Sequence, residues 1–183
     1  MKNKSLLFIL ALLVVILLAA VPLYRNLSGQ VVDPAGTVSQ QQSAALPAPD
    51  FTFYHPDGTA ANLSDYFGKP IVLNFWASSC GPCRSEMPAF QTAYDTLGGE
   101  VQFLMVNVTD GHWDTRESAG AYIESAGFTF PVFYDTDNHA AFTYGLRGLP
   151  TTFFINAEGS VVGSRNGAMS YDVLMGGINL IHH

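Results

Sequence analysis

The chain has 183 residues, 13% of them charged, and its 15 acidic and 8 basic residues give a formal net charge of −7 at pH 7. So acidic a chain is a poor partner for nucleic acid or for anionic lipid, and neither kind of binding is expected. The chain contains only two cysteines, Cys80 and Cys83. Because both lie in one short motif, no cysteine is left for a structural disulfide elsewhere.

The N-terminal segment is strongly apolar over Leu6–Tyr24. As a helix it would span about 28 Å, close to the hydrocarbon thickness of a bilayer. The apolar run is longer than that of a cleaved signal peptide, which is the alternative. Lys2 and Lys4 precede the run and only Arg25 follows it closely, which places the N-terminus in the cytoplasm. We therefore expect residues 1–24 to form a single-pass signal anchor in the cell membrane, with the rest of the chain outside.

Two regions follow the predicted anchor. Residues 25–46 are rich in polar residues and show no apolar periodicity, which is typical of a flexible linker. Residues 47–183 have the length of one domain.

The pattern of this domain alternates strands with helices and then ends in a hairpin. Apolar runs predict strands over residues 50–54, 71–76, 101–108, 128–134 and 151–156, with a hairpin strand over 161–165. Capping and turn residues predict a single turn over 62–68 and helices over 83–97, 115–126, 138–144 and 170–181, the last weakened by Gly176-Gly177. We therefore expect an α/β fold with a central mixed sheet covered by helices on both faces.

The cysteine pair lies where the strand over 71–76 passes into a helix. Unpaired N–H groups and the helix dipole favour an anion there, and the thiolate is the form of cysteine that attacks disulfides. A structural disulfide across so short a loop would add little stability, zinc would need about four ligands, and inert thiols would not need Gly81-Pro82 between them. The pair therefore indicates thiol–disulfide exchange, with a redox-active disulfide in place of a cofactor and no metal.

Two segments carry a resemblance to a known family. Phe75–Arg84 (FWASSCGPCR) resembles the active site of thioredoxins, and Arg147–Ile155 (RGLPTTFFI) resembles their cis-proline segment. With the N-terminal anchor, a leading hairpin and the helix inserted at 115–126, the chain resembles the TlpA/ResA branch of membrane-anchored, extracytoplasmic thiol–disulfide oxidoreductases. The resemblance implies a thioredoxin-like fold with an N-terminal hairpin and a central insertion.

The resemblance also implies catalytic roles. Cys80 matches the attacking cysteine and Cys83 the resolving one. Ordinary thioredoxins carry a buried carboxylate on the preceding strand, where this chain has Asn74, which cannot shuttle a proton. Glu86 lies on the same side of the predicted helix as Cys83, resembles the acidic residue of this branch, and would take the proton of Cys83. A first-turn glutamate that interacts only with the helix dipole is an equally good interpretation.

The remaining matched positions are assigned to substrate binding. Pro150 matches the cis-proline, and the backbone of Leu149 would pair with an extended substrate segment. Trp76, Gly81 and Pro82 would contact the substrate as well. Without the cysteine motif, Pro150 would be interpreted as a turn proline that opens a strand.

The resemblance implies an enzyme that reduces protein disulfides, receives electrons from a membrane thiol transporter, and serves apocytochrome c in cytochrome c-type biogenesis. Two alternatives remain. Thiol peroxidases carry Thr or Ser three residues before the reactive cysteine and Pro seven before, where this chain has Ala77 and Leu73. A non-catalytic thioredoxin-like binding module would not need an intact Cys-Gly-Pro-Cys.

Overall fold

The computed structural model describes residues 39–40, 46–111 and 114–182. The predicted signal anchor over 1–24 and most of the predicted linker over 25–46 lie outside these ranges. Within them, no helix combines the length and the apolar character needed to cross a membrane.

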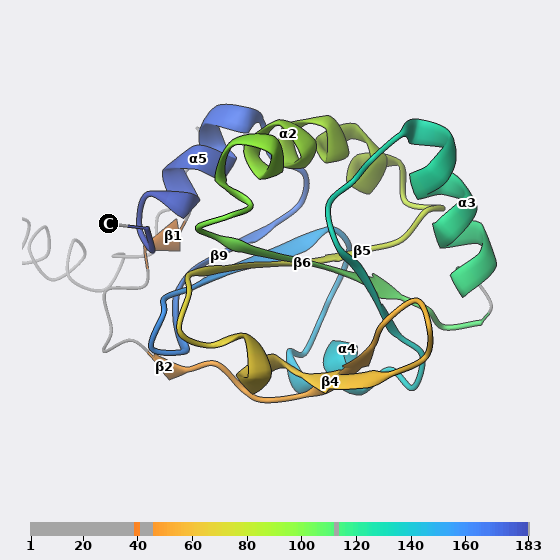
Figure 1. Cartoon of the computed structure of the whole chain (residues 1–183), viewed down its shortest axis with the longest axis horizontal. Coiled ribbons are helices and arrows are strands. Elements are labelled where there is room, and N and C mark those ends of the chain that lie inside the picture. The colour runs from red at the N-terminus through yellow and green to blue at the C-terminus, as the bar shows by residue number, and fades with distance from the viewer. Residues whose placement is uncertain (1–38, 41–45, 112–113, 183) are drawn as a thin grey trace, which may run out of the picture. The chain divides into compact units, whose positions relative to one another are not determined.

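A mixed sheet forms the framework of the domain (Figure 1). Its strand order is β1-β9-β8-β5-β6-β7-β3-β4, and β2 also pairs with β9. The central strands β5, β6 and β7 run parallel, while β8 is antiparallel to β5 and β9 to β8. The strand bounds are β1 (Ser39–Gln40), β2 (Leu46–Pro47), β3 (Thr52–Tyr54), β4 (Ala60–Asn62), β5 (Ile71–Trp76), β6 (Gln102–Val108), β7 (Val132–Asp135), β8 (Thr151–Ile155) and β9 (Ser160–Asn166).

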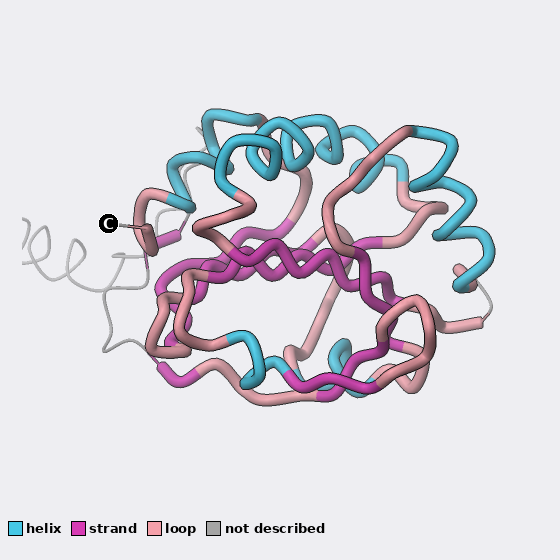
Figure 2. The backbone as a smooth tube through the Cα atoms, in the orientation of Figure 1, coloured by secondary structure: helices cyan, strands magenta, loops and turns pink. Residues whose placement is uncertain are grey.

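Helices lie on both faces of this sheet, as predicted. Figures 1 and 2 show α2, α3 and α5 over one face and α4 on the other, where the end of the sheet that holds β3 and β4 curls beneath the central strands. The helix bounds are η1 (Leu63–Tyr66, a 3-10 turn), α2 (Gly81–Leu97), α3 (Arg116–Ala126), α4 (His139–Thr143) and α5 (Tyr171–Ile178).

Strand β5 faces an apolar core on each side because its successive side chains alternate between the faces. Val72 and Trp76 pack in the core under α2 and α5, whereas Leu73 and Phe75 pack in the core under η1 and α4. Every residue of β5 is buried. The same alternation places Asn74, a polar side chain, inside the core on the α2 face, where it requires hydrogen-bond partners.

The structure differs from the predicted elements at several ends. Helix α2 begins at Gly81 rather than at Cys83, because Cys80 caps it. The strand expected over 128–134 is shorter, and only Val132–Asp135 pairs in the sheet. Ser39–Gln40, inside the predicted linker, pairs with the edge strand β9. Such edge pairing uses backbone groups, so no apolar pattern in the sequence predicts it.

Candidate active site

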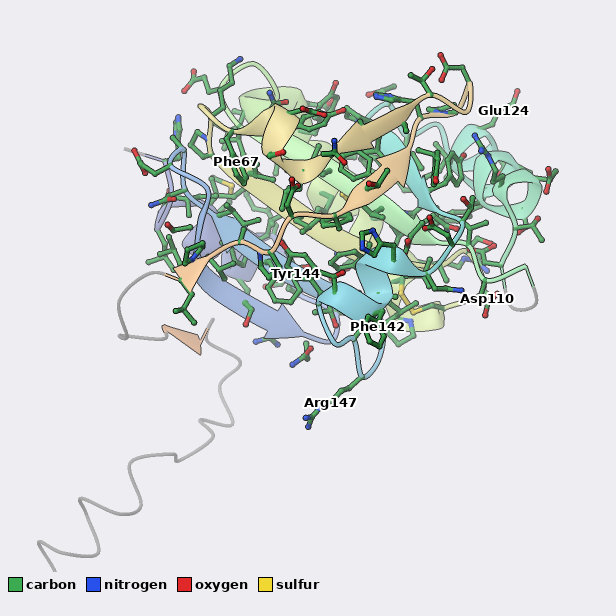
Figure 3. All side chains as sticks on the ribbon, turned by 90° about the horizontal axis from the view of Figure 1, so that it is seen from below. Phe67, Asp110, Glu124, Phe142, Tyr144 and Arg147 are labelled. Atoms are coloured by element: carbon green, nitrogen blue, oxygen red, sulfur yellow. A yellow bond between two sulfur atoms is a disulfide. The ribbon has the colours of Figure 1, made fainter. Side chains whose placement is uncertain are left out.

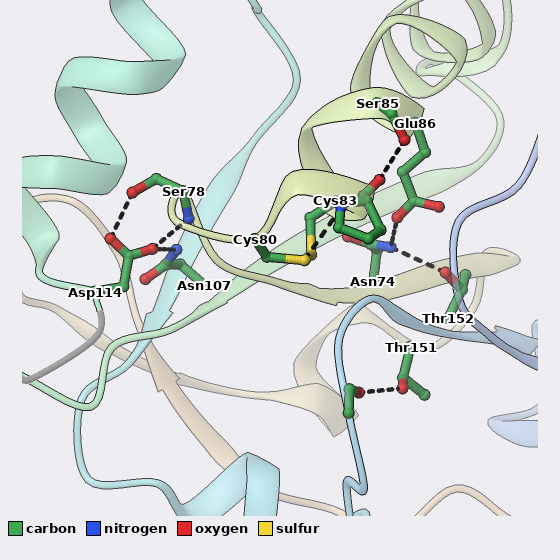
Figure 4. Close-up of a disulfide and its surroundings, with 12 residues drawn as sticks. Asn74, Ser78, Cys80, Cys83, Ser85, Glu86, Asn107, Asp114, Thr151 and Thr152 are labelled. Carbon is green, nitrogen blue, oxygen red and sulfur yellow. Dashed lines mark hydrogen bonds between the residues drawn. A yellow bond between two sulfur atoms is a disulfide. The ribbon is translucent and has the colours of Figure 1, made fainter.

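Cys80 and Cys83 form a disulfide between the end of β5 and the start of α2, with 5.2 Å between their Cα atoms (Figure 4). Cys80 is the N-cap residue of α2, and the backbone N–H of Cys83 donates to its Sγ at 3.2 Å. Cys83 is completely buried and Cys80 is half-buried. A partner can therefore reach the sulfur of Cys80 first, and the helix N-terminus would stabilise its thiolate.

The three residues expected to contact a substrate around the cysteines have different environments. Gly81 and Pro82 are exposed in the first turn of α2, where a proline costs no helical hydrogen bond. Trp76 is 0% exposed and packs in the core beside Tyr122. Strand alternation turns its indole under α2, so Trp76 is not exposed in this structure, and its role in substrate binding remains a prediction.

Glu86 is also buried, with 1% of its surface exposed. Its Oε1 accepts a hydrogen bond from Asn74 Nδ2 at 2.9 Å, and its Oε2 accepts one from the backbone N–H of Met169 at 3.1 Å. Burial raises the pKa of Glu86 to about 7, although these two hydrogen bonds and the nearby charge of Arg165 act to lower it. A carboxyl with this pKa can accept and release a proton near neutral pH.

This placement bears on the two interpretations of Glu86. Helix α2 begins at Gly81, so Glu86 lies beyond the first turn, and its buried carboxyl points toward the sheet (Figure 4). A side chain with these contacts is not a simple exposed partner of the helix dipole. Its position one turn after Cys83 suits a proton acceptor for that thiol.

Asn74 orients the carboxyl of Glu86. Its Nδ2 donates to Thr152 Oγ1 at 2.9 Å as well as to Glu86, and Asn74 and Thr152 are paired across β5 and β8. Thr152 in turn is paired with Arg165 on β9. A row of three polar side chains thus crosses the sheet beneath α2. The contributions of Thr152, Arg165 and Met169 could not be predicted from the sequence, because each is far from Glu86 along the chain.

The cis-proline segment lies next to the cysteines. The Leu149–Pro150 bond is cis, as expected. Because β8 is antiparallel to β5, Thr151 at its start pairs with Phe75 near the end of β5, and the cysteine loop follows directly. No backbone hydrogen bond of Leu149 occurs within the described ranges. Its N–H and C=O therefore remain available to a partner strand.

A second buried carboxylate, Asp114, was not predicted from the sequence. It accepts hydrogen bonds from Ser78, in the cysteine loop, and from Asn107 on β6 (Figure 4). The available signal was topological: polar residues at the carboxyl ends of adjacent parallel strands lie together.

Two side chains in and after α4 are exposed at the surface. Phe142, 87% exposed, and Arg147 project outward from α4 and from the loop after it (Figure 3). Single exposed apolar side chains are ordinary on soluble domains. The described part of the chain contains no group of three or more His, Cys, Asp and Glu side chains placed to hold a metal ion.

Comparison with known proteins identifies the family. The family described as AhpC/TSA matches residues 44–164. The thiol-disulfide oxidoreductase ResA of Bacillus subtilis (strain 168) is 32% identical over 182 residues, which cover 99% of this chain and 96% of that protein. ResA of Geobacillus thermodenitrificans (strain NG80-2) is 36% identical over 124 residues, covering 67% of this chain and 69% of that protein.

The fold agrees with a solved structure as well. The crystal structure of StoA from Bacillus subtilis has a TM-score of 0.60 and 27% identity, covering 72% of this chain and 96% of that one. These similarities confirm the predicted fold and the predicted exchange chemistry of the cysteine pair. The chain therefore belongs to the AhpC/TSA family and is a ResA-type thiol–disulfide oxidoreductase with a thioredoxin-like fold.

Proposed function

We propose that this enzyme reduces disulfides of proteins outside the cytoplasmic membrane. The observation that carries the proposal is the asymmetry of the site: a reachable Cys80, a completely buried Cys83, and a buried carboxyl at Glu86 one turn further along α2. This arrangement suits a first attack by one sulfur and release of the substrate by the other. The Cys-Gly-Pro-Cys sequence matches reducing thioredoxins, which supports the reducing direction.

The reaction would proceed in two exchanges. In the reduced enzyme, the Cys80 thiolate attacks one sulfur of the substrate disulfide, forming a mixed disulfide and releasing the other substrate sulfur as a thiolate, which then takes a proton. Cys83 next loses its proton to the Glu86 carboxylate and attacks the sulfur of Cys80. The second substrate sulfur leaves as a thiolate, which then takes a proton, and the enzyme keeps the Cys80–Cys83 disulfide. Two electrons have moved from the enzyme dithiol to the substrate.

The free backbone of Leu149 favours an extended substrate. A peptide segment that carries an accessible cysteine would pair with Leu149 as an added strand beside Pro150. Gly81 and Pro82, both exposed, would border the same segment. Apocytochrome c is the substrate that we propose from the resemblance, within cytochrome c-type biogenesis, and a membrane thiol transporter is the proposed electron donor.

The apolar segment Leu6–Tyr24 supports the proposed location. It would anchor the enzyme in the cell membrane next to its electron donor, with the domain on the outer side. Mass spectrometry of the N-terminus of the native protein tests this point. A mature chain that begins near Val21 or later would contradict an uncleaved anchor.

Trapping of mixed disulfides tests the catalytic assignment. Cys83→Ser leaves the attacking sulfur but removes the resolving one, so this variant should accumulate mixed disulfides with protein substrates. Cys80→Ser, the matched control, should accumulate none, because the remaining sulfur is completely buried. The opposite pattern would reverse the two roles. Rapid, Cys80-dependent consumption of hydrogen peroxide without trapped proteins would favour a peroxidase instead.

A further inference from the structure

Asp114 is a buried carboxylate, 2% exposed, that accepts hydrogen bonds from several directions. Ser78 donates to it twice, through its backbone N–H and through its hydroxyl at 2.6 Å. Asn107 Nδ2 donates at 2.7 Å, and the backbone N–H of Thr115 at 3.1 Å. The hydroxyl of Ser118 donates as well.

These contacts keep the carboxyl ionised. Burial alone would raise the pKa of Asp114, but the hydrogen bonds from Asn107, Ser118 and Ser78 outweigh burial and hold the pKa below its ordinary value. Hydrogen bonds to an ionised carboxylate are stronger than those between neutral groups. The hydrogen bonds that the Asp114 carboxylate accepts are therefore strong at neutral pH.

The donors come from three parts of the chain. Ser78 belongs to the loop that carries the cysteines, Asn107 to the end of β6, and Thr115 and Ser118 to the start of α3. Figure 4 shows Asp114 between α3 and the cysteine loop. Asp114 thus ties the cysteine loop to β6 and to the inserted helix, although it does not touch either sulfur through a hydrogen bond in the described structure.

The connection reaches Cys80 through a short stretch of backbone. Ser78 lies two residues before Cys80, and the N–H of Cys80 donates to the carbonyl of Ala77 at 3.2 Å. We propose that Asp114 is a positioning residue for thiol–disulfide exchange, which acts through Ser78 to hold the cysteine loop so that the Cys80 sulfur faces the N-terminus of α2. This role does not depend on the direction of electron flow or on the protein substrate.

Two physical effects of Asp114 on Cys80 have opposite signs, which makes the role testable. If Asp114 positions the loop, its loss lets the Cys80 sulfur leave the helix N-terminus, and the thiolate becomes less stable. If Asp114 acts only as a negative charge through space, its loss makes the thiolate more stable. The pKa of Cys80 in the reduced enzyme would rise in the first case and fall in the second.

The experiment is the pH dependence of Cys80 alkylation in the reduced full-length chain, followed at Cys80 by mass spectrometry. We expect Asp114→Ala to raise the midpoint by about half a unit to one unit, which reduces the thiolate fraction below the midpoint by about threefold to tenfold. Ser78→Ala, which keeps the charge and removes one of the two hydrogen bonds, should raise it by a smaller amount. Ser78→Thr, which keeps a hydroxyl at this position, should leave the midpoint near the wild-type value.

Thr115→Ala provides the matched control, because it removes the N-cap hydroxyl of α3 but leaves Asp114 and Ser78 in place. It should weaken α3 without moving the Cys80 midpoint. If Asp114→Ala fails to fold, the Ser78 variants still test whether Asp114 positions the cysteine loop. A midpoint that falls or stays unchanged in Asp114→Ala and Ser78→Ala, or that moves equally in Thr115→Ala, would overturn the positioning role.

Discussion

Replacing Glu86 by glutamine should remove a pH dependence of stability from the oxidised enzyme. The Glu86 carboxyl is 1% exposed, and burial raises its pKa from 4.5 to about 7. At pH values below 4.5 the carboxyl is protonated in both the folded and the unfolded chain, so it contributes no pH dependence to stability. As the pH rises from 4.5 to about 7, the unfolded chain releases the proton first, and the folded state loses stability relative to it.

The size of the effect follows from the shift. A pKa difference of about 2.5 units corresponds to about 3 kcal/mol in the free energy of unfolding, an order-of-magnitude value that is reached once the pH exceeds the folded pKa. Glu86→Gln removes the ionisation but keeps the size of the side chain. It also disturbs the contacts from Asn74 and Met169, because only the amide oxygen can still accept. That loss is independent of pH and cancels when pH values are compared.

Urea denaturation of the disulfide-bonded protein at a series of pH values between about 5 and about 8 provides the assay. The wild-type protein should lose about 2.5 kcal/mol of stability over this range relative to Glu86→Gln. Glu124→Gln, which removes an exposed carboxylate from α3, is the control and should follow the wild type (Figure 3). Parallel pH profiles for the wild type and Glu86→Gln would refute the inference that burial perturbs this carboxyl.

Two further substitutions test the charge near Glu86 and the packing of α5 against β8. Arg165→Leu removes the charge that lowers the pKa of Glu86, so the midpoint of the same pH-dependent loss of stability should move to higher pH; an unchanged midpoint would exclude Arg165 from this role. Gly177→Ala should destabilise the fold by about 1–3 kcal/mol, because its Cβ would lie 2.1 Å from a ring carbon of Phe154. Gly176→Ala, where a Cβ meets no atom within 4 Å, should be neutral or stabilising in the same thermal melts, and equal losses at both glycines would contradict the packing argument.

The elements that the sequence predicted best are those with complete local signals. Strand β5 has the predicted bounds, Ile71–Trp76, because a short continuous apolar run between turn residues is typical of a buried strand. Helix α3 ends at the predicted residue and begins one residue after the predicted start, since Thr115 caps its start and Gly127 adopts a left-handed conformation at its end. The cysteine pair and Pro150 were identified for the same reason: each lies in a short, specific motif.

The surroundings of the cysteines could not be predicted in this way. Glu86 could be identified as a candidate, but its hydrogen-bond donors are Asn74, which is 12 positions away, and Met169, which is 83 positions away. Asp114 and Ser78 are 36 positions apart, and only the parallel pairing of β5 with β6 brings the ends of these strands together. Such contacts are properties of the sheet order, which local periodicity does not encode.

The reduction potential of the Cys80–Cys83 pair tests most directly the proposal that this enzyme is a reductase. Equilibration of the full-length enzyme with glutathione buffers of known ratio gives this value from the fraction of disulfide present. We predict a potential below about −200 mV, toward the reducing value of thioredoxin at about −270 mV. A potential near about −120 mV, typical of the strong oxidant DsbA, would contradict it.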